Sequence, residues 1–208
     1  ILDPFVVNKM PFSVLASSGC DALVHSLEGF VSKKANQHSK YFSKKAYNLI
    51  MQNLPVLLKG KGTINNWSNM QWAAIYAIWG LSNSSSGPAG ALSYYLGSNF
   101  SVPHGIAGAC FIGKITRLNF NRGLYVYSEL SDKYDTSNKK NINKKNARII
   151  VNQVEKLLQL TRISQKLGHY GVEKNHIPDF VNFIKKSKEA FELNPIKFKK
   201  SEYKFILT

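Results

Sequence analysis

The sequence is poor in acidic residues and in arginine, and both scarcities narrow the classes of protein to which it can belong. Twelve aspartates and glutamates stand against 28 lysines and arginines, which gives a formal net charge of +16. Only four of the basic residues are arginines, the side chain that readers of nucleic acid use for bidentate contacts, and no DNA- or RNA-binding motif is present. We therefore expect no nucleic-acid partner. The paired lysines predict a solvated surface whose positive field could attract an anionic ligand.

Cysteine and long hydrophobic segments are also scarce. Cys20 and Cys110 each lie among apolar neighbours, which is typical of buried free thiols in a reducing compartment, so we expect a cytoplasmic protein without a disulfide. The longest apolar run, residues 72–81, is about half as long as a membrane span must be, so no membrane association is expected. A hydrophobic content of 44% is enough for a sizeable core.

Apolar residues recur at helical spacing and alternating strand patterns are nearly absent, so the sequence predicts an all-α bundle, one domain over residues 1–208. The expected helices lie at residues 20–31, 42–57, 68–81, 89–96, 103–115, 150–158 and 180–191. Pro55 should kink or end the second helix, a capping box at 68–71 should open the third, and Gly97 should end the fourth. The buried face of the third helix is expected at Ala73, Ala74, Ala77, Ile78 and Leu81. Pro103 suits the first position of the fifth helix, and residues 132–146 predict a flexible surface insertion.

The first of these helices carries a polar stripe beside its apolar face. Because residues four and seven apart share one side of a helix, Asp21, His25, Glu28 and Ser32 fall on one line. An Asp and a His one turn apart can act together as metal ligands, since they aim an oxygen and a nitrogen in the same direction. The alternative is an exposed Asp–His pair without a ligand.

Three stretches of the chain match a known family: Asp3-Pro4, the run from Asp21 to Glu28 followed by Ala35-Asn36, and Val102-Pro103-His104-Gly105-Ile106-Ala107. They resemble the iron-containing alcohol dehydrogenases, whose larger group includes dehydroquinate synthase and glycerol dehydrogenase. The resemblance runs from residue 1 to the end but covers only the family's C-terminal, all-helical half. The N-terminal dinucleotide-binding domain has no counterpart here. Because the chain also begins with Ile1 instead of Met, we expect a fragment that is inactive by itself.

The resemblance implies a metal site made of an Asp and a His one turn apart and two further histidines. Asp21 and His25 match the first two ligands, and His104 matches the last. The remaining ligand position is Gly90, and Tyr94 stands where many members carry a further active-site His. Two imidazoles and one carboxylate still make a usable three-ligand site with open positions. Otherwise, Tyr94 or substrate oxygens complete the coordination, or the metal chemistry has been lost.

The function that the resemblance implies is that of a metal- and NAD(P)-dependent alcohol dehydrogenase or aldehyde reductase. A divalent metal, with Fe²⁺ expected and Zn²⁺ as the alternative, would polarise the oxygen of a small alcohol or aldehyde. Hydride would pass between the substrate and a nicotinamide presented by the missing domain. Tyr94 would line the substrate pocket or relay a proton. A homodimer is also expected. Two alternatives stay open: a related enzyme for a phosphorylated or sugar-acid substrate, and a metal-free helical module without catalysis.

The other histidines predict no site. His38 should be exposed, and His169 and His176, on either side of Gly171, should be surface or capping residues. Glu28 is expected to hold its helix by hydrogen bonding, with a supporting role behind the metal ligands as the alternative.

Overall fold

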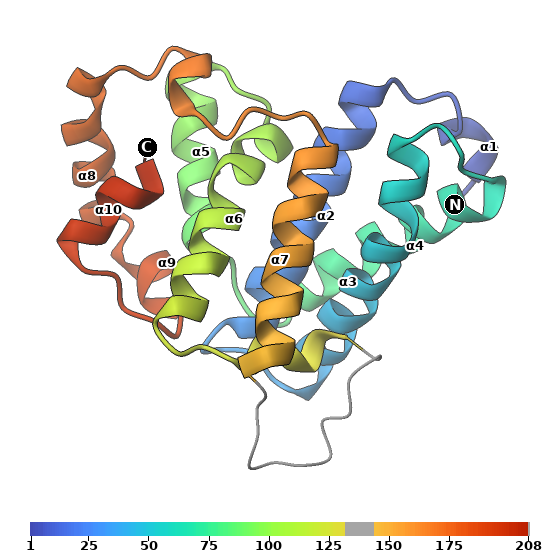
Figure 1. Cartoon of the computed structure of the whole chain (residues 1–208), viewed down its shortest axis with the longest axis horizontal. Helices are drawn as coiled ribbons and strands as arrows, with labels where there is room; N and C mark the ends of the chain where they lie inside the picture. The colour runs from blue at the N-terminus through green and yellow to red at the C-terminus, as the bar shows by residue number, and fades with distance from the viewer. Residues whose placement is uncertain (132–143, 208) are drawn as a thin grey trace.

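The computed structural model describes residues 1–131 and 144–207, and helices are the only regular elements in these two ranges (Figure 1). The helices are α1 (Pro4–Val7), α2 (Phe12–Val31), α3 (Gln37–Leu58), α4 (Ile64–Ser82), α5 (Pro88–Phe100), α6 (His104–Asn121), α7 (Lys144–Leu160), α8 (Ile177–Lys186), α9 (Lys188–Leu193) and α10 (Lys200–Leu207). Short 3₁₀ turns lie at Val126–Leu130, Leu167–Tyr170 and Lys174–His176. The expectation of an all-α fold is confirmed.

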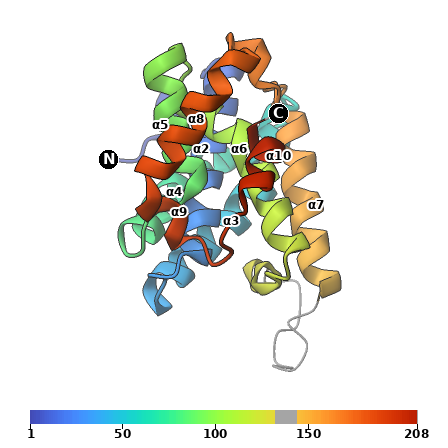
Figure 2. The same ribbon diagram turned by 90° about the vertical axis from the view of Figure 1, so that its left-hand side faces the viewer.

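Helix α2 forms the centre of the bundle. It contacts α3 and α4 on one side and α6 on the other, while α7 packs against α6 (Figure 1). Figure 2 shows α8, α9 and α10 on the side that faces the viewer, where α8 and α9 contact α5 and α10 contacts α6. A helix in this position must be apolar around most of its circumference, and the side chains of Cys20, Leu23 and Leu27 are at most 1% exposed.

The lower half of α2 approaches α3 and α4 closely because two glycines meet there. A Cβ atom on Gly29 would lie 2.9 Å from Ser43 Oγ and 3.1 Å from the backbone of Gly80. A Cβ atom on Gly80 would lie 3.0 Å from the backbone nitrogen of Ser43. The three helices can therefore pack this closely only with glycine at both positions. The two glycines also fix how far along its axis α2 lies relative to α3 and α4.

The third predicted helix starts too late, whereas the second ends within one residue of its predicted bound. Helix α4 begins at Ile64, because Thr63 is its N-cap and the Thr63 backbone N–H donates to Asn66 Oδ1 at 2.8 Å. The box expected at 68–71 thus lies inside the helix. Pro55 does not end α3, which continues to Leu58.

The fourth and fifth helices also differ from their predicted bounds. Helix α5 runs past Gly97 to Phe100 and ends where Ser101 adopts a left-handed conformation with φ of 55°. Pro103 is the N-cap of α6, so the first helical residue is His104. The glycine signal thus misplaced the end of α5 by four residues, and the proline signal misplaced the start of α6 by one.

The C-terminal part holds more helices than the sequence pattern indicated. The single helix expected at 180–191 is divided into α8 and α9 at Ser187, whose ψ of 31° leaves the helical range. Helix α10 and the short α1 had no predicted counterpart. Of the insertion expected at 132–146, the last three residues are helical and belong to α7, and residues 132–143 lie outside the described part of the chain. No helix within the described ranges is long and apolar enough to cross a membrane.

Both cysteines are free and buried, as the sequence predicts. Burial raises the pKa of Cys20 to about 12 and that of Cys110 to about 11. Because the thiolate is the reactive form, modification of the native protein by Ellman's reagent at pH 8 is expected to be at least roughly a hundredfold slower than that of the unfolded chain. The release of the thionitrobenzoate ion measures this rate. Two thiols should react in guanidinium and one in a Cys110→Ala variant, whereas rapid reaction of the native protein would contradict the burial.

Candidate metal centre

Asp21, His25 and His104 meet at one point between α2 and α6. His104 Nε2 lies 3.5 Å from Asp21 Oδ1, and His25 Nε2 lies 3.8 Å from the same oxygen. One ligand atom from each residue can be chosen so that all three lie within 4.8 Å of one another. The structure therefore brings together the three side chains that the sequence singled out, from helices far apart in the chain.

Local sequence explains why each side chain reaches this point. Asp21 and His25 are one turn apart at the edge of the buried face of α2, with side chains 32% and 19% exposed. His104 is the first residue of α6, directly after the N-cap Pro103. The next residue, Gly105, lies against the backbone carbonyl of Ser17 in α2, in space that a Cβ atom would fill. The absence of a side chain on Gly105 thus lets α6 approach α2 closely enough for His104 to reach Asp21.

The electrostatics of the cluster favour a neutral His25. Burial lowers the pKa of His25, His104 lowers it further, and Asp21 partly opposes this. A neutral imidazole keeps a nitrogen lone pair available, which is the form that binds a metal ion. Two imidazoles and one carboxylate are a donor set suited to Fe²⁺ or Zn²⁺. The residues present therefore fit the metal that the sequence predicts.

The fourth ligand position of the predicted site offers no side chain. Gly90 lies in the first turn of α5, where a Cβ atom would overlap Ser86 Oγ and lie 3.2 Å from Glu28 Oε2. A larger residue at position 90 could enter only if Ser86 moved. The Ser86 hydroxyl thus fills the space beside Gly90, and among the His, Cys, Asp and Glu side chains of the described residues the cluster holds three candidate ligands.

Tyr94 borders the cluster without joining it. Its ring centroid lies 4.8 Å from that of His104, with the two planes inclined by 47°. The side chain is otherwise largely in solvent, since Tyr94 is 68% exposed. Tyr94 therefore contacts one of the three candidate ligands from outside the cluster.

A cavity of about 440 Å³ opens over the cluster. The three candidate ligands line it together with Ser17 and Ser18 of α2 and Ala74 and Ile78 of α4. The apolar pattern of α4 had assigned Ala74 and Ile78 to the core, but Ala74 is exposed and Ile78 is 43% exposed. Periodicity alone cannot distinguish an apolar face against the core from one that lines a cavity.

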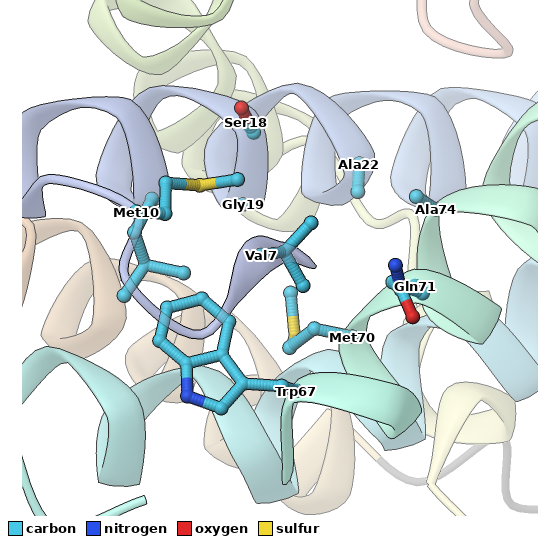
Figure 3. A pocket seen from close by; sticks show the side chains of 10 residues that line it. Val7, Met10, Ser18, Gly19, Ala22, Trp67, Met70, Gln71 and Ala74 are labelled. Carbon is cyan, nitrogen blue, oxygen red and sulfur yellow. The ribbon is translucent and has the colours of Figure 1, made fainter. Parts of the chain in front are cut away.

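A second, apolar cavity of about 130 Å³ adjoins the first between α1, α2 and α4 (Figure 3). Ser18, Ala22 and Ala74 line both cavities. In Figure 3 the side chains of Met10, Trp67 and Met70 surround the apolar space. The sequence did not indicate this cavity, because it forms only where α1 folds back over α4.

The three other histidines behave as the sequence predicts, but Glu28 does not hold its own helix: its hydrogen bonds go to the start of α5. His38 and His169 are exposed, and His176 Nδ1 accepts the backbone N–H of Glu173 at 3.0 Å, which caps the turn before α8. None of these three histidines lies among the residues of the cluster.

Comparison with known proteins adds independent evidence. A family model described as "Fe-containing alcohol dehydrogenase family, C-terminal" matches residues 15–208. The 1-propanol dehydrogenase of Citrobacter freundii is 32% identical over 119 residues, which cover 57% of this chain and 32% of that protein. The 1,3-propanediol dehydrogenase of the same organism is 25% identical over 202 residues, which cover 97% of this chain and 52% of that protein.

Similarity of structure extends over nearly the whole chain. The crystal structure of a 1,3-propanediol oxidoreductase superposes with a TM-score of 0.84 at 23% identity, covering 98% of this chain and 53% of that one. A match at this identity shows a shared fold. The chain thus spans about half the length, or less, of these relatives.

Proposed function

Because this chain belongs to the Fe-containing alcohol dehydrogenase family, we propose that it is the metal- and substrate-binding half of an oxidoreductase that acts on a small alcohol or aldehyde. The observation that carries the proposal is the meeting of Asp21, His25 and His104 at one cavity.

Each residue of the centre has a role in this proposal. Asp21, His25 and His104 would hold Fe²⁺ or Zn²⁺, which supplies a Lewis acid for the substrate oxygen when it is bound. Asp21 contributes the one negative charge of the set, and the lowered pKa of His25 keeps that ligand neutral. Tyr94, whose ring lies against that of His104, would line the substrate pocket or relay a proton.

The redox step needs a hydride carrier as well as the metal. We propose NAD(P) as the hydride carrier, bound mainly by the dinucleotide-binding domain that the resemblance places ahead of the helical half. The apolar cavity beside the cluster gives uncharged parts of a ligand a place next to the candidate metal ligands. The proposal also includes a cytoplasmic homodimer as the working form.

The experiment that tests the proposal is a metal titration of the chain after removal of all metal. Isothermal titration calorimetry with Zn²⁺, and with Fe²⁺ under anaerobic conditions, is expected to give one site per chain. Heat of binding at that stoichiometry would support the three-residue centre. A well-folded protein that binds neither ion would overturn the proposal and favour the metal-free helical module.

A further inference from the structure

The carboxylate of Glu28 lies buried at the start of a helix that is not its own. Glu28 belongs to α2 and is 4% exposed. Its oxygens accept the backbone N–H groups of Gly87 at 2.8 Å, Ala89 at 2.6 Å and Gly90 at 3.2 Å, and the Ser86 hydroxyl at 3.2 Å. In the described chain no Lys, Arg or His forms an ion pair with it. The four donors at the start of α5 are therefore its partners.

This arrangement replaces a local helix cap. The first N–H groups of a helix have no partner within that helix, and its N-terminal end carries partial positive charge. The N-cap of α5 is Gly87, which has no side chain to accept them. Burial raises the pKa of the Glu28 carboxyl, while the α5 amides and the Ser86 hydroxyl oppose this rise. The cost of burying the carboxylate is thus offset only while α5 begins at this point.

The hydrogen bonds from the start of α5 to Glu28 connect α2 and α5, the two helices beside His104. Helix α2 carries Asp21 and His25, and α5 carries Tyr94, whose ring contacts His104. Because α5 is continuous from Pro88 to Phe100, the place of Tyr94 follows from the place of its first turn. Gly90 permits the arrangement, since a Cβ atom there would collide with Ser86 Oγ.

We propose that Glu28 is a positioning residue: it ties the first turn of α5 to α2 and thereby holds Tyr94 against His104. Its value for catalysis rests on the proposed function, but the geometry exists without metal or substrate. The inference can therefore be tested separately from metal binding.

The test uses the ring current of Tyr94 as a probe of its distance from His104. In NMR spectra of the metal-free protein, a His104→Gln variant assigns the His104 imidazole signals. A Tyr94→Leu variant then gives their positions without the neighbouring ring. In Glu28→Gln, one acceptor oxygen becomes an NH₂ group that faces N–H donors, so at least one donor of α5 loses its partner. We expect the His104 signals of Glu28→Gln to move toward their positions in Tyr94→Leu.

A matched control separates this effect from a general loss of stability. Asn53 is also buried, and its Oδ1 accepts the side-chain amides of Asn66 and Asn69, which ties α3 to α4 away from α5. An Asn53→Leu variant should lose stability but leave the His104 signals in place.

Unchanged His104 signals in a folded Glu28→Gln protein would overturn the inference. If that variant does not fold, Ser86→Ala removes one of the four donors and should produce a smaller shift in the same direction. Unchanged signals in Ser86→Ala would then overturn it instead. If the parent chain binds no zinc, the proposed function is overturned, but the comparison of His104 signals between variants still tests the role of Glu28.

Discussion

Replacement of Asp21 by Asn is expected to lower the affinity of the chain for Zn²⁺ by at least about 100-fold, since even residues behind the ligands change metal affinity by about 10–100-fold. Asp21 supplies the single carboxylate of the cluster, and one of its oxygens faces both His25 and His104. The amide keeps the size of the side chain but removes the charge that compensates a divalent cation. Calorimetric titration of the metal-free proteins measures the change.

A control variant and a stability measurement accompany this prediction. Asp179→Asn makes the same chemical change on an exposed residue of α8 and should leave zinc affinity unaltered. The free energy of unfolding of metal-free Asp21→Asn should differ from that of the parent by less than about 1 kcal/mol, because the ion pairs of Asp21 are long and partly exposed. Equal zinc affinity in Asp21→Asn and the parent would remove Asp21 from the ligand set.

Gly105→Ala is expected to destabilise the protein by about 3 kcal/mol, at the upper end of the range for substitutions that overpack a core. We also expect it to weaken zinc binding. The new Cβ atom would overlap the carbonyl oxygen of Ser17 and lie 2.8 Å from its carbonyl carbon. Both are backbone atoms, so no side-chain rotation can relieve the overlap and α6 must move away from α2. Because His104 precedes Gly105, the same movement would separate His104 from Asp21. Denaturant unfolding followed by circular dichroism measures the stability loss.

Gly168→Ala provides the matched comparison for this substitution. A Cβ atom on Gly168 would have no other atom within 4 Å, and its backbone does not have a positive φ. Its stability should therefore stay within about 0.5 kcal/mol of the parent. A Gly105→Ala protein as stable as Gly168→Ala would mean that α2 and α6 can separate at little cost, which would contradict the close approach.

Much of the site could be predicted from sequence, but helix ends and apolar faces could not. Asp21 and His25 share one side of α2 because of helical periodicity alone, so their pairing needed no tertiary information. The start of α4 and the end of α5 depended on which side chain or turn satisfied the terminal backbone groups, and the local signals at residues 68–71 and at Gly97 misplaced them. Ala74 and Ile78 have core-like composition, yet they line the cavity because no described element covers that side of α4.

The sequence by itself determined that the chain is helical and where the carboxylate and imidazole of α2 lie relative to each other, because both follow from interactions within a few residues. The resemblance to a known family had already named His104, but only the tertiary structure shows it beside Asp21, with Ser86 filling the space next to Gly90 and Glu28 capping α5. Each of these depends on the distance between helices that are remote in the chain. That distance is set by side-chain volume at the crossings, above all by glycine at position 105, and it is not encoded in any local pattern.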